Sequence, residues 1–329
     1  MDLGLAGRTA VVCASNQGLG RACATELARA GCTVVINGRD AAKLERTAEG
    51  IRQETGATVI PVAADLDAPD GPTQLVAAVP TVDILVNNNG GPPPRDFRQV
   101  DEAALVAGVR ANMATPIRLV QLVVDGMVER RFGRIVNVTS ASVKQPLPGL
   151  DLSSGARAGL TGFLAGVART VAHANVTINF LLPGSFATPL MQAIQEGAAR
   201  QQGVTPEEIA EHARQSIPAG RFGEPAEFGA ACAGARRSAR GHPDVANGGG
   251  RPAGSPRSAV PADPRSGLQP VQPAVAAPGR DPPPDQTLAL SAPILTAHEH
   301  GARLLHIFLG LYILGRSILI PFGGAFPRP

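Results

Sequence analysis

Aromatic residues other than phenylalanine are almost absent from this sequence, which has no tryptophan and a single tyrosine, Tyr312, in 329 residues. Single-stranded nucleic acids are bound on stacked aromatic side chains among basic ones, and no such interleaving occurs, so nothing indicates a nucleic-acid partner. The four cysteines, Cys13, Cys23, Cys32 and Cys232, lack the spacing of metal ligands. We therefore expect no metal site and no disulfide framework, but buried thiols of a cytosolic protein.

Lysine is also scarce, with two residues against 28 arginines, and the charge is unevenly distributed. Residues 1–233 carry 20 basic and 22 acidic side chains, whereas residues 234–329 carry 10 and 5. No charged-then-apolar leader opens the chain, so we expect a cytoplasmic protein. The long apolar stretch 304–322 is interrupted by His306 and Arg316. A spanning helix needs about 20 apolar residues with few charges, so we predict no membrane span.

What the sequence does contain is a regular alternation of short apolar runs and helical patterns as far as residue 233. The runs are β-branched and apolar on both faces, which predicts an α/β fold with a single doubly wound parallel sheet, a Rossmann fold. Such sheets bind ligands at the carboxyl ends of their strands. The expected strands are 8–14, 32–37, 58–64, 82–87, 133–139 and 176–182, and the expected helices are 18–30, 40–54, 72–79, 101–128, 154–173, 189–200 and 205–215.

The turn after the first strand is a candidate phosphate site. It leaves the first amides of the next helix unpaired, with the positive end of the helix dipole behind them. Gly18 would let the backbone approach a pyrophosphate, and Gly20 would let the helix pack close to the strand. A plain strand-turn-helix is the alternative. The predicted contacts in this turn are Ser15, Gln17, Gly18, Leu19 and Gly20.

The residues after the later strands extend this candidate site. Arg39 follows the second strand together with Asn37, and an arginine here accommodates the 2′-phosphate of NADP, so NADP is predicted and NAD remains possible. The neighbouring Asp40 would be either a helix cap or a competing ribose ligand. The other candidates are Asp65 and Leu66 at the adenine edge, Asn88 and Gly90 in a polar turn, and Pro183, Gly184 and Thr188 at a carboxamide.

The motifs of residues 5–233 occur in a defined order: Gly18 and Gly20, Asp65, Asn87 to Gly90, Asn112, Ser140, Pro183 and Gly184, Thr188, and residues 220–225. In this order and spacing the chain resembles the short-chain dehydrogenase/reductase family, and within it the 3-oxoacyl-acyl-carrier-protein reductases. The resemblance implies an NAD(P)-dependent oxidoreductase that reduces a small ketone or 3-oxoacyl thioester by hydride transfer. It also implies a homo-oligomer.

The match fails where that family does its proton chemistry, with a tyrosine thirteen residues after a serine and a lysine four residues further on. Counting from Ser140, these positions hold Ser153 and Arg157, and Tyr312 lies far away in the tail. A tyrosine beside a cation can serve as a general acid. A serine hydroxyl is a much weaker acid, and an arginine cannot itself exchange a proton.

Three interpretations follow from this departure. In the first, the protein is still a reductase, in which Ser140 polarises the carbonyl and a water chain through Asn112 delivers the proton. In the second, it binds the dinucleotide without turnover and acts as a regulatory or partner subunit. In the third, Ser153 and Arg157 are a helix cap and a surface residue, and only the fold is shared. The candidate catalytic residues are thus Asn112, Ser140, Ser153 and Arg157.

Two further places bear on function. Ala14 replaces the first glycine of the phosphate turn, which is tolerable if its φ is negative. The segment 189–217 is where such folds carry a substrate lid. Its residues Leu190, Met191 and Ile194 would wall an apolar substrate, or else belong to an amphipathic helix packed on its own domain.

The periodicity stops after residue 233. Residues 234–285 contain 11 prolines and 8 glycines and no apolar stripe, a composition typical of disorder. We therefore divide the chain into a dinucleotide-binding domain, 1–233, and a Pro/Gly/Arg-rich tail, 234–329. Because the family's final strand is missing there, one hypothesis is a frameshift near residue 233. A natural disordered extension is the alternative.

Overall fold

The computed structural model describes residues 3–235. Its centre is one parallel six-stranded sheet in the order β3-β2-β1-β4-β5-β6, as the alternation of strands and helices predicts. The strand order reverses between β1 and β4, which is the place where doubly wound sheets bind their ligands. The strands are β1 (Thr9–Val12), β2 (Thr33–Gly38), β3 (Val59–Ala63), β4 (Ile84–Asn87), β5 (Gly133–Val138) and β6 (Val176–Leu181).

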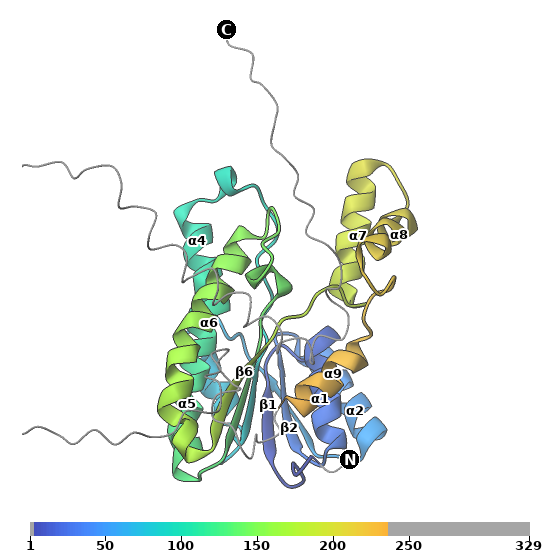
Figure 1. Cartoon of the computed structure of the whole chain (residues 1–329). Coiled ribbons are helices and arrows are strands. Elements are labelled where there is room, and N and C mark those ends of the chain that lie inside the picture. The colour runs from blue at the N-terminus through green and yellow to red at the C-terminus, as the bar shows by residue number, and fades with distance from the viewer. Residues whose placement is uncertain (1–2, 236–329) are drawn as a thin grey trace, which may run out of the picture. The chain divides into compact units, whose positions relative to one another are not determined.

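Helices cover both faces of this sheet (Figure 1). One face carries α1 (Gly18–Arg29), α2 (Ala41–Thr55) and α9 (Pro225–Gly234), and the other carries α4 (Glu102–Val109), α5 (Thr115–Glu129) and α6 (Asp151–Val171). The short α3 (Gly71–Val76) packs beside α5, while α7 (Pro189–Gln202) and α8 (Pro206–Ser216) pack against each other. Among the described residues no helix is long and apolar enough to cross a membrane.

Each strand contributes alternate side chains to two separate cores. In β1, Ala10 and Val12 join the core beneath α1 and α2, whereas Val11 joins the core beneath α5 and α6. All three are fully buried. This explains why the apolar runs show no polar alternation: both faces of the sheet are covered. The four cysteines are buried, as expected from their spacing.

The helix expected over 101–128 is not continuous. The chain forms α4 and α5 with a π-helical turn, Arg110–Ala114, between them. This turn carries Asn112, which is 1% exposed. Single π-helical turns inside helices often occur at functional sites, because the extra residue redirects one side chain. Short 3₁₀ helices, which the sequence pattern does not predict, span Phe97–Gln99, Ala141–Val143 and Ala172–Ala174.

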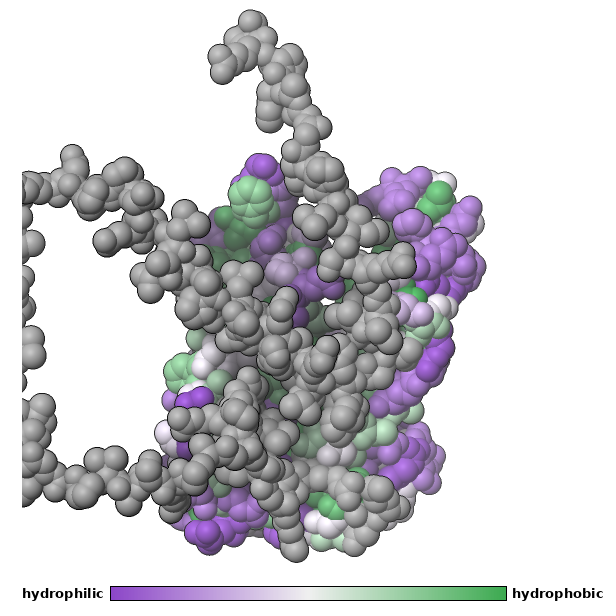
Figure 2. Space-filling model, in the orientation of Figure 1, coloured by the Kyte–Doolittle hydropathy of each residue, from purple (hydrophilic) through white to green (hydrophobic). Residues whose placement is uncertain are grey.

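Helices α7 and α8 project beyond the carboxyl ends of the strands (Figure 1). Their visible surface is largely hydrophilic, with apolar residues at single places (Figure 2). Leu190 and Ile194 are 64% and 47% exposed, and Ala199 alone is buried in α7. Helix α7 is therefore not packed on its domain as an ordinary amphipathic helix would be. The tail from residue 236 onward, including the proposed frameshift, lies outside the described residues.

Candidate functional site

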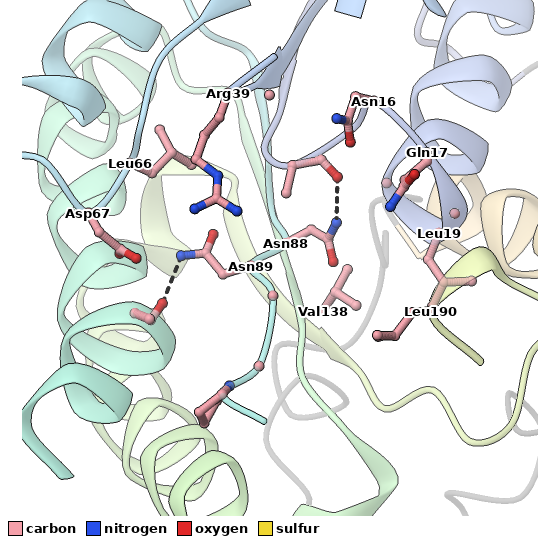
Figure 3. Close-up of a pocket in the computed structure, with 18 of the residues that line it drawn as sticks. Asn16, Gln17, Leu19, Arg39, Leu66, Asp67, Asn88, Asn89, Val138 and Leu190 are labelled. Carbon is pink, nitrogen blue, oxygen red and sulfur yellow. Dashed lines mark hydrogen bonds between the residues drawn. The ribbon is translucent and has the colours of Figure 1, made fainter. Parts of the chain in front are cut away.

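A cavity of about 930 Å³ opens at the carboxyl ends of the strands (Figure 3). The structure brings to it most of the residues predicted from the sequence: Gln17, Gly18, Leu19, Gly20, Asn37, Arg39, Asp65, Leu66, Asn88, Gly90, Arg157, Pro183 and Thr188. Five other predicted residues do not line it: Ser15, Asn112, Ser140, Ser153 and Gly184. Pro92, Pro93 and Arg95 complete its rim.

The turn from β1 into α1 has the geometry that a phosphate site requires. Gly18 has a φ of 57°, in the left-handed region. A Cβ on Gly20 would lie 2.3 Å from the carbonyl oxygen of Ala14, so no side chain fits there. Thr188 closes the turn from the opposite side, because its Cβ lies 3.8 Å from the Cβ position of Gly18. The unpaired amides of α1 thus face the cavity, where they can bind an anion.

Two polar residues of this region serve the scaffold instead. The Ser15 hydroxyl donates to the Val12 carbonyl over 2.7 Å and accepts from the Asn37 amide over 2.9 Å, and it is fully buried. The Asn37 side chain donates to the carbonyls of Val62 and Ala64 and accepts from the Ala14 amide. Both side chains therefore fix the ends of β1, β2 and β3.

The condition under which Ala14 is tolerable, a negative φ, is not met, since its φ is 43°. The left-handed conformation costs a residue with a Cβ about 1–2 kcal/mol, so we expect Ala14→Gly to raise the free energy of unfolding by about 1 kcal/mol. Urea denaturation measures this change. The matched control is Ala77→Gly, because Ala77 has a φ of −69° and should lose stability. If Ala14→Gly also lost stability, the claim that Ala14 is strained would be contradicted.

One end of the cavity is cationic. Arg39 extends into it (Figure 3), and Lys43 lines it from the first turn of α2. Asp40 is a helix cap, because its carboxylate accepts from the Lys43 amide over 2.9 Å. The Lys43 ammonium also hydrogen-bonds to Gln17 in the phosphate turn. Sequence reasoning missed Lys43, although its place four residues after Arg39 was a usable signal.

The neighbouring wall is formed by the segment after β3. Leu66 is 8% exposed and faces the cavity with Asp65 and Asp67 (Figure 3). The Thr115 hydroxyl donates to the Asp67 carboxylate over 3.2 Å. An apolar side chain flanked by two acceptors suits a flat heterocycle with an exocyclic amine. That this wall is the adenine edge stays a prediction.

At the opposite end lies Arg157, one of the two residues that replace the expected catalytic pair. Arg157 is 8% exposed, and its guanidinium donates to three oxygens: Val138 O at 2.8 Å, Asn89 O at 2.9 Å and Ser153 Oγ at 3.0 Å. Burial lowers its pKa to about 10, so it stays charged at neutral pH. No carboxylate forms an ion pair with it within residues 3–235. The interpretation of Arg157 as a surface residue is therefore wrong.

Ser140 and Asn112 lie near this end without lining the cavity. Ser140 follows Val138 and Thr139, which do line it, and its Oγ accepts from the Ser142 amide over 3.1 Å. Asn112 donates to the Gly90 carbonyl over 3.5 Å, and its Oδ1 has no partner. A buried acceptor of this kind has room for one further donor.

Metal chemistry has no support in the described part of the chain, where no cluster of three or more His, Cys, Asp or Glu side chains could hold an ion. Lys144 is exposed on the loop after Ser140. It lies outside the residues that line the cavity. Arg157, by contrast, lines the cavity, and Arg95 lies on its rim.

A phosphate turn, a switch point and a cationic end together define a dinucleotide-binding α/β protein. Residues 8–199 match the family described as short chain dehydrogenase. The 3-oxoacyl-acyl-carrier-protein reductase of Aquifex aeolicus is 30% identical over 231 residues, which are 69% of this chain and 89% of that protein. Acetoacetyl-CoA reductase of Allochromatium vinosum is 30% identical over 232 residues, again 69% and 89%. The chain belongs to the short-chain dehydrogenase/reductase family, as the sequence motifs predict.

Solved structures agree with this assignment. L-sorbose reductase of Gluconobacter frateurii, complexed with NADPH and L-sorbose, superposes with a TM-score of 0.69 at 26% identity, over 72% of this chain and 92% of that one. A 3-oxoacyl-acyl-carrier-protein reductase of Agrobacterium tumefaciens with NADP bound gives 0.64 at 28% identity, over 70% and 88%. Both similar proteins hold a nicotinamide dinucleotide.

Proposed function

We propose that this chain is an NADP-dependent reductase of a small ketone or 3-oxoacyl thioester. The observation that carries the proposal is the cavity itself, which joins a phosphate turn and two cations at one end to Arg157 at the other. Similar proteins named as reductases of acetoacetyl-CoA, 3-oxoacyl-acyl carrier protein and L-sorbose support the reaction class. NAD is the alternative cofactor.

The described residues fit a nicotinamide dinucleotide. Gly18 leaves space for a pyrophosphate at the start of α1, Gly20 lets this helix pack close to Ala14, and the first amides of α1 would supply the donors. Arg39 and Lys43 hold the 2′-phosphate by charge-assisted hydrogen bonds. Leu66 packs against the adenine. When bound, the dinucleotide supplies the hydride.

The opposite end holds and polarises the carbonyl. Ser140 donates its hydroxyl to the carbonyl oxygen, and Arg157 supplies a fixed positive charge that stabilises the negative charge developing there. Asn112 is the proposed holder of a water chain, because its Oδ1 is buried and lacks a partner. The proton step is weaker than in relatives with a tyrosine, since neither Ser153 nor Arg157 is an effective acid.

The substrate faces an apolar wall. Leu152 is buried in the lining, and Leu190 lies opposite at the start of α7. Met191 and Ile194 continue the apolar surface on this helix, and the 64% exposure of Leu190 leaves it open to a ligand. A short acyl chain or a small ketone suits this end of the cavity.

The alternative is a subunit that binds the dinucleotide without turnover. This alternative is supported by the hydrogen bonds of Arg157, because its guanidinium donates to two backbone carbonyls and to the Ser153 hydroxyl. In that case the pair Ser153 and Arg157 stabilises the site, and no proton reaches a substrate.

Two measurements on the purified full chain separate these functions. Calorimetric titration with NADPH tests cofactor binding, and an assay of NADPH oxidation with acetoacetyl-CoA and a panel of simple ketones tests turnover. We expect binding and slow oxidation. Binding without oxidation of NADPH by any carbonyl would support the partner subunit, and absence of binding would refute both.

We also propose that the chain is a cytoplasmic homo-oligomer. The layer formed by α4, α5 and α6 exposes large apolar side chains, which monomeric proteins rarely gather in one area. Light scattering of the purified protein gives its mass, and a monomer at micromolar concentration would contradict the proposal. The exposed residues are Leu105, Val109, Leu122 and Phe163.

A further inference from the structure

Three serine side chains form a hydrogen-bonded chain next to the cavity. The Ser154 hydroxyl, in the first turn of α6, donates to the Ser142 hydroxyl over 2.9 Å. The Ser142 hydroxyl donates to Ser140 Oγ over 2.8 Å. Ser142 is 2% exposed and Ser154 is 9% exposed, so both are buried, whereas Ser140 at the end of the chain is partly exposed.

This arrangement leaves the hydroxyl proton of Ser140 available to a ligand. Its oxygen already accepts two hydrogen bonds, from the amide and from the hydroxyl of Ser142. A serine hydroxyl has one proton and two acceptor sites, so the proton of Ser140 is the part left for a ligand. Hydrogen bonds in such a chain also polarise one another, which strengthens the last donor.

We propose that Ser142 and Ser154 are positioning residues that pass protons to Ser140 during carbonyl reduction. The inference rests on the proposed function. The bound dinucleotide would supply a hydride to the carbonyl carbon, and the carbonyl oxygen, which gains the π electron pair, takes the proton of Ser140. Ser140 takes the proton of Ser142, Ser142 takes that of Ser154, and Ser154 takes one from water. The products are the alcohol, the oxidised dinucleotide and a hydroxide ion, which the solvent buffer neutralises.

The absence of the tyrosine is the reason such a path matters. The alkoxide that forms from a ketone is about as basic as a serine alkoxide, so proton transfer from Ser140 is close to balanced. If Ser140 gave up its proton and received none, it would become a negatively charged alkoxide. Buried charges without partners are strongly disfavoured. The chain of hydroxyls removes this cost because it transfers the negative charge from Ser140 to water.

The proposal differs from the water chain through Asn112. The Asn112 side chain hydrogen-bonds to Gly90, and within residues 3–235 it forms no hydrogen bond to any of the three serines. The serine chain therefore predicts a loss of rate on substitution of Ser142 or Ser154, whereas the water chain predicts it on substitution of Asn112.

The test uses Ser154→Ala and Ser142→Ala in the full chain, with acetoacetyl-CoA and a panel of simple ketones. We expect a roughly tenfold lower kcat, the effect of about one hydrogen bond, with an unchanged KM. We also expect a change in how kcat depends on the deuterium fraction of the solvent. The dependence should be curved in the wild type, where several protons move, and linear in the variants. Ser154→Thr keeps a hydroxyl and should restore both properties.

The matched control is Thr170→Val on the same helix, because the Thr170 hydroxyl bonds to the Val167 carbonyl at an exposed place. NADPH affinity should be the same in all variants that fold. If Ser142→Ala does not fold, Ser154→Ala decides alone. An unchanged solvent isotope dependence in Ser154→Ala would overturn the proton path but leave the reductase in place. A wild-type protein that oxidises no NADPH would overturn the reductase, and the path with it.

Discussion

Exchanging Ser153 for tyrosine and Arg157 for lysine together is expected to raise the turnover of a 3-oxoacyl thioester or ketone by about 10²–10⁴, the usual contribution of a positioned acid. The wild-type serine cannot provide this acid, and the buried arginine keeps its charge at neutral pH because its pKa is about 10. The measurement is kcat for NADPH oxidation in Ser153→Tyr/Arg157→Lys against the wild type.

The two single variants are the controls for this exchange. In Arg157→Lys, the ammonium must satisfy the carbonyls of Val138 and Asn89 with fewer donors, so we expect lower stability and no gain in rate. In Ser153→Tyr, the phenol lies beside a cation and should gain part of the rate. Its ring must fit beneath the loop at Gly91, whose Cβ position is 3.4 Å from Ser153 Oγ. If the double variant folds and binds the cofactor but is no faster than the wild type, then the missing acid does not limit the rate of turnover.

The second large effect is expected for Arg39→Asp, which should weaken NADPH binding by about 10–100-fold, the effect of one hydrogen bond to a charged group. An aspartate repels the 2′-phosphate and accepts from a ribose hydroxyl instead. NADH binding should therefore stay the same or improve. Calorimetric titration of both dinucleotides measures the ratio.

Arg46→Asp is the matched control for the change of charge. Arg46 lies on α2, the helix that follows Arg39, but is exposed and does not line the cavity, so its replacement should alter the ratio of affinities little. Equal affinities of the wild-type protein for NADPH and NADH would contradict the role of Arg39.

The sequence predicts the sheet well because its signal is local and strong. The four inner strands, β1, β2, β4 and β5, are short apolar runs buried on both faces. Each of the six expected strands lies where the structure has one. The cavity follows from the same pattern, since parallel strands end at one edge of a sheet. This is why most residues chosen at strand ends line one cavity.

The details that sequence reasoning missed depend on contacts across the fold. Nothing local distinguishes Ser15 as a phosphate contact from Ser15 as a bridge between β1 and β2, because the deciding partner is Asn37. The positive φ of Ala14 arises from the close approach of Gly20 and Asn88 to its carbonyl. The π-helical turn at Asn112 interrupts an apolar pattern that reads as continuous helix.

The most direct test of the central claim is transfer of the hydride itself. The full chain is incubated with NADPH deuterated at the nicotinamide C4 and with acetoacetyl-CoA or a simple ketone, and the alcohol product is analysed by mass spectrometry. Deuterium on the carbinol carbon is the predicted result, and Ser140→Ala should reduce its rate of appearance. If NADPH binds and no alcohol carries deuterium from either face of the nicotinamide, the protein is a dinucleotide-binding subunit and not a reductase.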